Sequence, residues 1–134
     1  MAQVKVTHEY NATADHVWSL IGDPADISNW HPAIATSPVA DKQRNCSLVD
    51  GGEIGEEILN HDDIARSYTY RIVHSPLPMR DYVSTLSVEP RRSGGSTVTW
   101  EAEFEPEGIG TEELQAMLGG LYDAGLSALA TKIQ

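Results

Sequence analysis

Residues 98–104 read "VTWEAEF", a run in which apolar and polar side chains alternate without exception. Successive side chains of a β-strand point to opposite faces of the sheet, so this alternation is typical of a strand with one buried face and one wet face. The buried face would hold Val98, Trp100, Ala102 and Phe104. Because an antiparallel sheet can leave its other face in water, the stretch predicts one strand of such a sheet.

The chain before this strand carries the same kind of pattern. From residue 34 to residue 104 there is no helical period, and five or six strand-like runs are separated by the turn signals "DGG" at 50–52, "HDD" at 61–63, "SPLP" at 75–78 and "RRSGG" at 91–95. This spacing predicts an antiparallel meander. On the two strands before the last one, the inner face would hold Tyr68, Tyr70, Ile72, Tyr82, Ser84, Leu86 and Val88.

Both ends of the chain complete the element order. Residues 4–10 alternate as a first strand, and two short helices follow, one capped by Thr13 and the other running from Pro24 to about Trp30. Thr111 caps a long amphipathic helix. Its apolar stripe is Leu114, Met117, Leu118, Leu121, Gly125, Ala128 and Leu129. The sequence therefore predicts one α+β domain over residues 1–134, in the order strand, two helices, six strands, helix.

Three glycines interrupt the long helix, at 119, 120 and 125. Each costs up to about 1 kcal/mol relative to alanine in a helix interior. They would either leave room between helix and sheet, or permit a bend, or allow close contact at small residues.

Turn lengths set the expected strand pairing. A three-residue loop at 50–52 places Leu48 opposite Ile54, Cys46 opposite Glu56, and Arg44 opposite Ile58. The same reasoning at 62–64 places Ile58 beside Tyr68 and Glu56 beside Tyr70.

Several polar side chains fall on the inner face of this predicted sheet. They are His8, Arg44, Glu56, Tyr68, Tyr70, Tyr82 and Ser84. An unpaired buried charge costs several kcal/mol, so a dry core would tolerate this set poorly. We therefore expect an internal cavity between a curved sheet and the long helix, mostly apolar and with a few polar groups that can orient a guest.

Several of these motifs together resemble a known superfamily. They are "WHP" at 30–32, "RNCSLVDGG" at 44–52, "YTYRIVHSPLP" at 68–78, "VTWEAEF" at 98–104 and "GLYDAGLSAL" at 120–129. The chain is similar to START-like proteins, also called SRPBCC, helix-grip or birch-pollen-allergen-like, and among them to small bacterial polyketide cyclase/dehydrase-type proteins. The resemblance implies a curved sheet of about seven strands gripping the last helix around a lipophilic pocket, in which some members hold a lipid, sterol, hormone or polyketide.

The resemblance carries over to few individual residues. Arg44 and Glu56 match polar positions that recur in such bacterial relatives. The "DGG" turn and "HSPLP" occupy the loops that form gate and latch in the plant abscisic-acid receptors, but the receptors' own motifs are absent from this sequence. Hormone reception is therefore not implied.

Candidate site residues follow from the inner-face set. Arg44 with Glu56 would be a structural ion pair, an anchor for a ligand, or an acid/base pair. Glu56 and His8 are the candidates for a catalytic role. We expect Trp30 to plug one end of the cavity and His31 to face its rim. The predicted ligand-binding residues are Arg44, Glu56, Tyr68, Tyr70, Tyr82, Ser84, Trp100, Trp30 and Leu121.

Charge and motif content exclude several classes of protein. Nine Lys plus Arg against 20 Asp plus Glu give a net charge of -11, which disfavours nucleic acid and anionic membrane surfaces as partners. The single cysteine, Cys46, fits a reducing cytoplasm, and the alternating N-terminal residues predict neither a signal peptide nor a membrane span. None of the five histidines lies at a recognised metal-ligand spacing, and no nucleotide fingerprint occurs, so we expect no metal and no cofactor.

These observations favour binding or carriage of a small hydrophobic or aromatic molecule. An alternative is a polyketide cyclase or dehydratase that uses the same pocket, with Glu56, His8 or a tyrosine moving a proton. A third hypothesis is a protein-interaction module that uses the acidic surface. The sequence does not define the oligomeric state.

Overall fold

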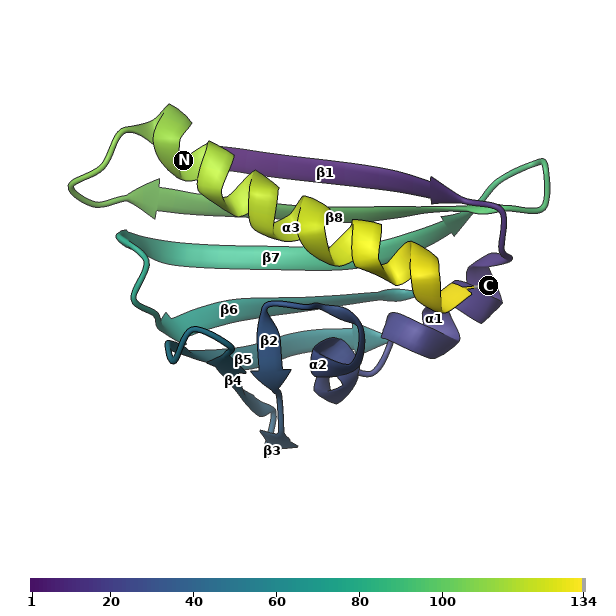
Figure 1. The fold of residues 1–134 in the computed structure, drawn as a ribbon, viewed down its shortest axis with the longest axis horizontal. Helices are drawn as coiled ribbons and strands as arrows, with labels where there is room; N and C mark the ends of the chain where they lie inside the picture. Colours follow the sequence, from purple (N-terminus) through teal and green to yellow (C-terminus); the bar gives the residue numbers. More distant parts are fainter. Residues whose placement is uncertain (134) are drawn as a thin grey trace.

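The computed structural model describes residues 1–133, and these form one antiparallel sheet with helices on its concave side (Figure 1). The strands are β1 (Ala2–Tyr10), β2 (Ile34–Thr36), β3 (Val39–Ala40), β4 (Gln43–Leu48), β5 (Glu53–Asp62), β6 (Ser67–His74), β7 (Met79–Pro90) and β8 (Ser96–Pro106). The helices are α1 (Ala14–Ile21), the 3-10 turn η1 (Pro24–Asp26), α2 (Ile27–Trp30) and α3 (Thr111–Ile133).

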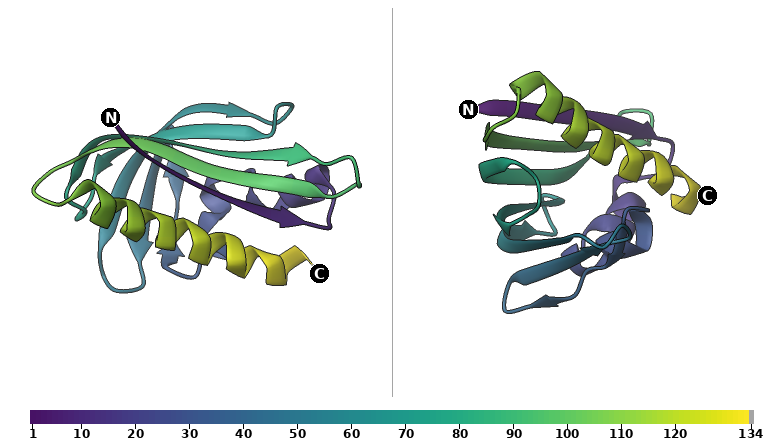
Figure 2. Two further views of the ribbon diagram at one scale, coloured as in Figure 1. Left: turned by 90° about the horizontal axis from the view of Figure 1, so that it is seen from above. Right: turned by 60° about the vertical axis from the view of Figure 1, so that its left-hand side comes forward.

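The sheet order places β1 at one edge and β2 at the other. Neighbouring strands follow the order β1, β8, β7, β6, β5, β4, β2, and β3 pairs with β4. The sheet curls, and α3 lies along its concave face, while α1 and α2 lie toward the C-terminal end of α3 (Figures 1 and 2). This confirms the predicted α+β helix-grip fold, with the two-residue strand β3 bringing the sheet to eight strands.

Side-chain parity is as the alternation in 98–104 predicts. Trp100 of β8 lies between Val6 of β1 and Leu86 of β7, so these three side chains share the concave face. The four residues expected to point inward, Val98, Trp100, Ala102 and Phe104, are at most 4% exposed. The core therefore lies between the concave face and α3.

The predicted pairing of β4 with β5 is wrong by two residues. Arg44 lies opposite Glu56, and Cys46 lies opposite Ile54. The loop does have three residues, but it is centred on Asp50, because the Leu48 N–H donates to the Gly52 carbonyl oxygen at 2.8 Å. A shift of two residues keeps every side chain on its predicted face.

The predicted pairing of β5 with β6 is also wrong. Ile58 lies beside Tyr70 and Glu56 beside Ile72, and the register changes between Ile58 and Asn60. An extra residue on one strand of a pair is a β-bulge, which bends that strand and increases its twist. Here the extra residue is Leu59. The turn also differs from the predicted 62–64, because Asp62 pairs with Ser67 and the turn therefore comprises the four residues 63–66.

The far end of β5 has a neighbour on one side only. β4 pairs with β5 as far as Glu57, and the Lys42 carbonyl accepts from the Ile58 N–H at 2.8 Å. Among the described residues, 60–62 pair with β6 alone.

Gly125 and the other two helix glycines have different surroundings. A Cβ atom on Gly125 would lie 2.5 Å from Cδ2 of His31, so this glycine allows close contact with an aromatic ring. A Cβ on Gly119 would meet only Val4, at 3.7 Å, and a Cβ on Gly120 would meet nothing within 4 Å. No helix within residues 1–133 combines the length and apolar composition that crossing a bilayer requires.

Candidate ligand-binding site

A small void lies between the concave face of the sheet and α3. Its volume is about 30 Å³. It is lined by Ile27, His31, Ile34, Cys46, Leu48, Ile54, Glu56, Tyr70, Ile72, Leu77, Tyr82, Trp100, Leu118, Leu121 and Tyr122. We call it the inner void.

A larger and almost wholly apolar cavity adjoins the inner void. Its volume is about 250 Å³. Five residues line both spaces: Leu48, Ile54, Leu77, Leu118 and Leu121. The remaining walls come from the loops after β4 and β6, and from Ala33 and Met117. This outer cavity opens beside the exposed side chains of Val49 and Met117.

Arg44 and Glu56 form a buried ion pair at the polar end of the site. Arg44 Nε donates to Glu56 Oε1 at 2.5 Å, and the two residues are 0% and 6% exposed. Arg44 Nη1 donates to the Pro24 carbonyl at 2.9 Å and to the Tyr68 hydroxyl at 3.1 Å. The guanidinium also lies 4.8 Å from the centre of the Tyr70 ring, which adds a cation–π contact. These contacts hold the Glu56 carboxylate in one position.

The two oxygens of Glu56 have different surroundings. Oε1 accepts from Arg44 and, at 3.4 Å, from the thiol of Cys46. Both hydrogen bonds that Glu56 accepts from described side chains go to this oxygen. Glu56 lines the inner void, whereas Arg44 lies behind it and lines neither cavity. Burial and the Glu56 charge raise the pKa of the Cys46 thiol to about 12, so this thiol stays protonated.

Three tyrosine hydroxyls meet beside the inner void. Tyr70 and Tyr82 are bonded at 3.2 Å, and Tyr82 is also bonded to Tyr122 of α3. The Trp100 ring stacks on Tyr122 with centroids 4.2 Å apart. Burial raises the pKa of Tyr70 and Tyr82 well above 10 and that of Tyr122 to about 12. All three are therefore neutral hydroxyl groups at physiological pH.

His31 is a correction to the sequence analysis, which placed it at the rim. It is 1% exposed and lines the inner void. Its Nε2 donates to the Leu121 carbonyl at 2.8 Å, and its Nδ1 accepts from the Ala33 N–H at 3.1 Å. Burial lowers the pKa of His31, with the Leu121 bond opposing the effect, so the ring is neutral.

His8 lies apart from the cavity. Strand parity does turn it toward α3, as predicted, but its Nε2 is bonded to Asp123 at 2.7 Å near the molecular surface. It lines neither the inner void nor the outer cavity. His8 is therefore not placed to act directly on a molecule in the cavity.

Some of the other predicted site residues line the inner void, and the rest lie behind its lining. Tyr70, Tyr82, Trp100 and Leu121 line the inner void with Glu56. Tyr68 bonds Arg44, and Ser84 bonds Trp100, from behind the lining. Trp30 is buried against Trp100, with ring centroids 5.6 Å apart, and lines neither cavity.

Tyr122 was missed by the sequence analysis, although a signal for it exists. It lies four residues after Leu118, so the helical period places both on one face of α3. The predicted apolar stripe included Leu118 and Leu121 but not this tyrosine.

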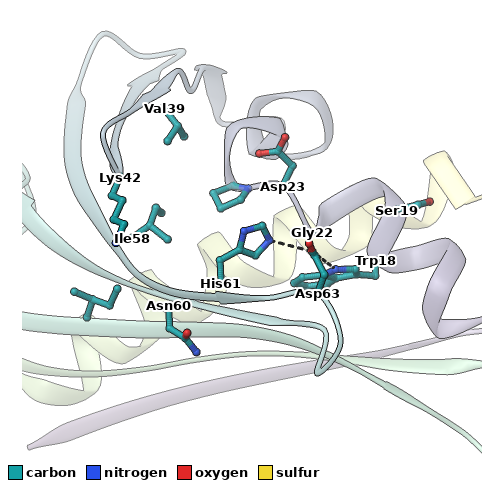
Figure 3. Close-up of a pocket in the computed structure, with 12 residues that line it drawn as sticks. Trp18, Ser19, Gly22, Asp23, Val39, Lys42, Ile58, Asn60, His61 and Asp63 are labelled. Atoms are coloured by element: carbon teal, nitrogen blue, oxygen red, sulfur yellow. Dashed lines mark hydrogen bonds and ion pairs between the residues drawn. The ribbon is translucent and has the colours of Figure 1, made fainter.

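A separate surface groove was also missed, with a volume of about 780 Å³ (Figure 3). It lies between the α1–η1 segment and β5, next to the β3–β4 turn. In it, Asp63 accepts from the Trp18 indole at 2.9 Å and lies 3.2 Å from His61 Nε2. Pro24 lines this groove and accepts from Arg44, so Arg44 connects the groove wall to Glu56. Within residues 1–133, no group of three or more His, Cys, Asp or Glu side chains could hold a metal ion.

Fold and site together define a small α+β protein with an internal cavity. The sequence profile of the family described as polyketide cyclase/dehydrase and lipid transport matches residues 1–134, and the chain belongs to this family. A comparison with curated proteins gives no match.

Solved structures include close relatives of this chain. XoxI from Bacillus cereus is 32% identical with a TM-score of 0.96, over 99% of this chain and 96% of that one. A START superfamily protein from Mycobacterium smegmatis is 12% identical with a TM-score of 0.84, over 99% and 97%. The Zhui aromatase/cyclase from a Streptomyces species is 14% identical with a TM-score of 0.81, over 98% and 92%. The last two likenesses show the fold alone.

Proposed function

We propose that the protein binds a small hydrophobic molecule in the space between its sheet and α3. The observation that carries the proposal is an apolar outer cavity that adjoins an inner void with a buried carboxylate, that of Glu56. Ligand sites are typically apolar spaces with a few polar groups that fix orientation. The family description, which includes lipid transport, supports this proposal. A cytoplasmic location remains part of the proposal and is supported by the single cysteine.

Each part of the site has a role in this proposal. The hydrocarbon body of the guest packs against Leu48, Leu77 and Leu121 in the outer cavity. The polar end of the guest reaches Glu56, and Arg44 holds that carboxylate in place. Burial of apolar surface supplies most of the affinity, at about 25 cal/mol per Å².

The test is an NMR titration of the protein with 2-methylnaphthalene, together with native mass spectrometry of freshly purified protein. Leu121→Trp fills the outer cavity and should weaken binding at least about tenfold, as expected when a bulky side chain occupies the ligand's space. Ala124→Trp adds the same ring at an exposed position of the same helix and should bind like the wild type. A wild-type protein that binds no lipophile, or equal binding by both variants, would contradict the proposal.

A second candidate function is that of a cyclase or dehydratase on a polyketide-like substrate. It is favoured by Glu56, whose carboxylate faces an enclosed site and could accept a proton from a guest. Glu56→Gln keeps the size of the side chain and should abolish turnover of such a substrate while leaving it bound. Unchanged turnover by this variant would remove Glu56 from the role.

A further inference from the structure

The polar groups that line the inner void differ in how much of their hydrogen-bonding capacity is already used. A guest can bond only to groups whose capacity remains free, since a buried donor or acceptor left without a partner is costly. The following inference rests on the proposed function and concerns the chemistry of the guest's polar end.

His31 and Cys46 have no donor left for a guest. The Nε2–H of His31 is taken by the Leu121 carbonyl, and its Nδ1 lone pair is taken by the Ala33 N–H. The thiol proton of Cys46 points to Glu56 Oε1. Both side chains are therefore satisfied by the protein itself.

The hydroxyl groups beside the void form a chain of hydrogen bonds in which every hydroxyl proton is already donated. Ser84 donates to the Glu101 carbonyl at 2.9 Å, so it can only accept from Tyr122, which lies 3.4 Å away. With Tyr122 donating to Ser84, Tyr82 donates to Tyr122 and Tyr70 donates to Tyr82, and each proton is used once.

The indole N–H of Trp100 is shared between the same groups. It lies 3.2 Å from the Tyr70 oxygen and 3.1 Å from Ser84 Oγ, so Tyr70 accepts from Trp100 while donating to Tyr82. Burial keeps these phenols protonated. The aromatic wall therefore presents satisfied hydroxyl groups and no spare proton.

Glu56 is the exception, because it lines the void and its second oxygen, Oε2, accepts no bond from residues 1–133. Three buried donors of the described chain also lack partners: Arg44 Nη2, Trp30 Nε1 and the Ser96 hydroxyl. None of these three residues lines the inner void or the outer cavity. The void thus offers a guest one strong acceptor and no free donor.

The charges at the site further restrict which guests can bind. A carboxylate would meet the Glu56 carboxylate before it reached Arg44. An ammonium group would add a second cation to a buried pair whose charges already balance, and burying an uncompensated charge is costly. A neutral donor avoids both costs.

The volumes of the two spaces also favour a guest with a hydroxyl group and an apolar body. The inner void, at about 30 Å³, matches the space that one water molecule or one hydroxyl group occupies. The adjoining apolar cavity, at about 250 Å³, has room for a hydrocarbon body.

We propose that the guest is a neutral apolar alcohol or phenol whose hydroxyl group enters the inner void and donates to Glu56 Oε2. Fatty acids, amines and molecules that carry only ketone or ether oxygens are disfavoured at this site.

Four naphthalenes of nearly equal size test this proposal by calorimetry at neutral pH. They are 2-naphthol, 2-methylnaphthalene, 2-methoxynaphthalene and 2-naphthoate. We expect 2-naphthol to bind at least about tenfold more tightly than each of the other three, as expected for a hydrogen bond to a charged acceptor. Equal or tighter binding by the hydrocarbon, the ether or the carboxylate would overturn the proposal while leaving ligand binding intact. Binding by none of the four would overturn the proposed function as well.

The Glu56→Gln variant provides a second test by the same calorimetric comparison. Its amide oxygen can accept from Arg44 and Cys46, which turns the NH₂ group toward the void and offers a donor in place of the acceptor. We expect 2-naphthol to lose its advantage over 2-methoxynaphthalene. Glu57→Gln is the matched control, because Glu57 bonds Arg71 on the opposite face of the same strand and should keep the wild-type order. A Glu56→Gln protein that is folded and still prefers 2-naphthol tenfold would contradict the assignment.

Discussion

Arg44 is an unusual residue for the interior of a small protein. Its side chain is fully buried, and yet it makes hydrogen bonds to Glu56, to the Pro24 carbonyl and to Tyr68. A buried charge is costly unless it is paired and hydrogen-bonded, and the bonds from Nε and Nη1 offset this cost although Nη2 has no partner in the described chain. Arg44 is therefore the residue on which the position of Glu56 depends.

Removing Arg44 alone should be strongly destabilising. We expect Arg44→Met to lower the free energy of unfolding by about 3–5 kcal/mol, because it leaves the Glu56 carboxylate buried without its partner. The double variant Arg44→Met, Glu56→Met should be more stable than the single one, since neither charge remains. Urea unfolding measures both. Arg71→Met removes an exposed pair with Glu57 and should cost about 1 kcal/mol or less. Equal costs for Arg44→Met and Arg71→Met would refute this account.

His31 should make stability depend on pH in a defined direction. Its folded-state pKa lies below the ordinary 6.5, so below that pH the unfolded chain binds a proton that the folded chain excludes. Stability from this group is complete above 6.5 and is lost as the pH falls, by up to about 1.4 kcal/mol per pH unit. Unfolding at pH ~7.5 and ~5.5 measures the loss.

The matched variants for this pH effect are His31→Gln and His16→Gln. The first removes the titrating ring and should show a smaller loss between the two pH values, whatever its stability at the higher one. The second changes an exposed histidine and should keep the wild-type loss. A His31→Gln protein with the full wild-type loss would show that other groups cause it.

At the scale of elements, the periodic sequence patterns predicted strands and helices correctly, whereas the turn lengths did not predict the strand registers. The alternation in β8 and the helical stripe in α3 each repeat over many residues, so a local irregularity does not change the assignment. The β4–β5 register depends on where one three-residue turn is centred, and a shift of two residues leaves every face unchanged. The β5–β6 register depends on the four-residue turn at 63–66 and on the bulge at Leu59, and residues 59–62 are all exposed, so no pattern of buried faces reveals the bulge.

The three glycines of α3 should respond differently to alanine. We expect Gly119→Ala and Gly120→Ala each to raise the free energy of unfolding by up to about 1 kcal/mol, because a methyl group fits there and alanine favours the helix. Gly125→Ala should instead lower it by about 1–3 kcal/mol, because the methyl group would overlap His31. Thermal or urea unfolding of the three variants gives the comparison, and a stabilising Gly125→Ala would contradict the contact described here.

At the scale of the whole molecule, the polar inner face indicated a cavity, while its contents depended on contacts between distant residues. His31 is buried because α3 offers the Leu121 carbonyl and the gap at Gly125, both about 90 positions further along the chain. The surface groove likewise joins α1 to β5. Local sequence patterns carry no information about such contacts between distant parts of the chain.

The acidic excess of the chain should make its stability rise with salt. With 20 acidic and nine basic side chains, repulsion between surface charges opposes the compact state, and salt screens it. We expect the midpoint of thermal unfolding to rise as sodium chloride increases from about 0.02 to about 0.15 M, where the Debye length is about 8 Å. The double variant Glu103→Gln, Glu107→Gln carries less acidic charge and should respond less. A midpoint that falls with salt would mean that attractive surface pairs dominate.

The one-sided end of β5 has a consequence for solubility. A strand with a free edge offers unpaired backbone groups to any other chain, and such edges are a common starting point for aggregation. In this protein the free stretch is only a few residues long, follows the bulge at Leu59, and ends beside Asp62 and Asp63. Shortness, a bend and negative charge are the features that discourage edge-to-edge pairing. The bulge at Leu59 therefore also discourages this sheet from joining that of another molecule.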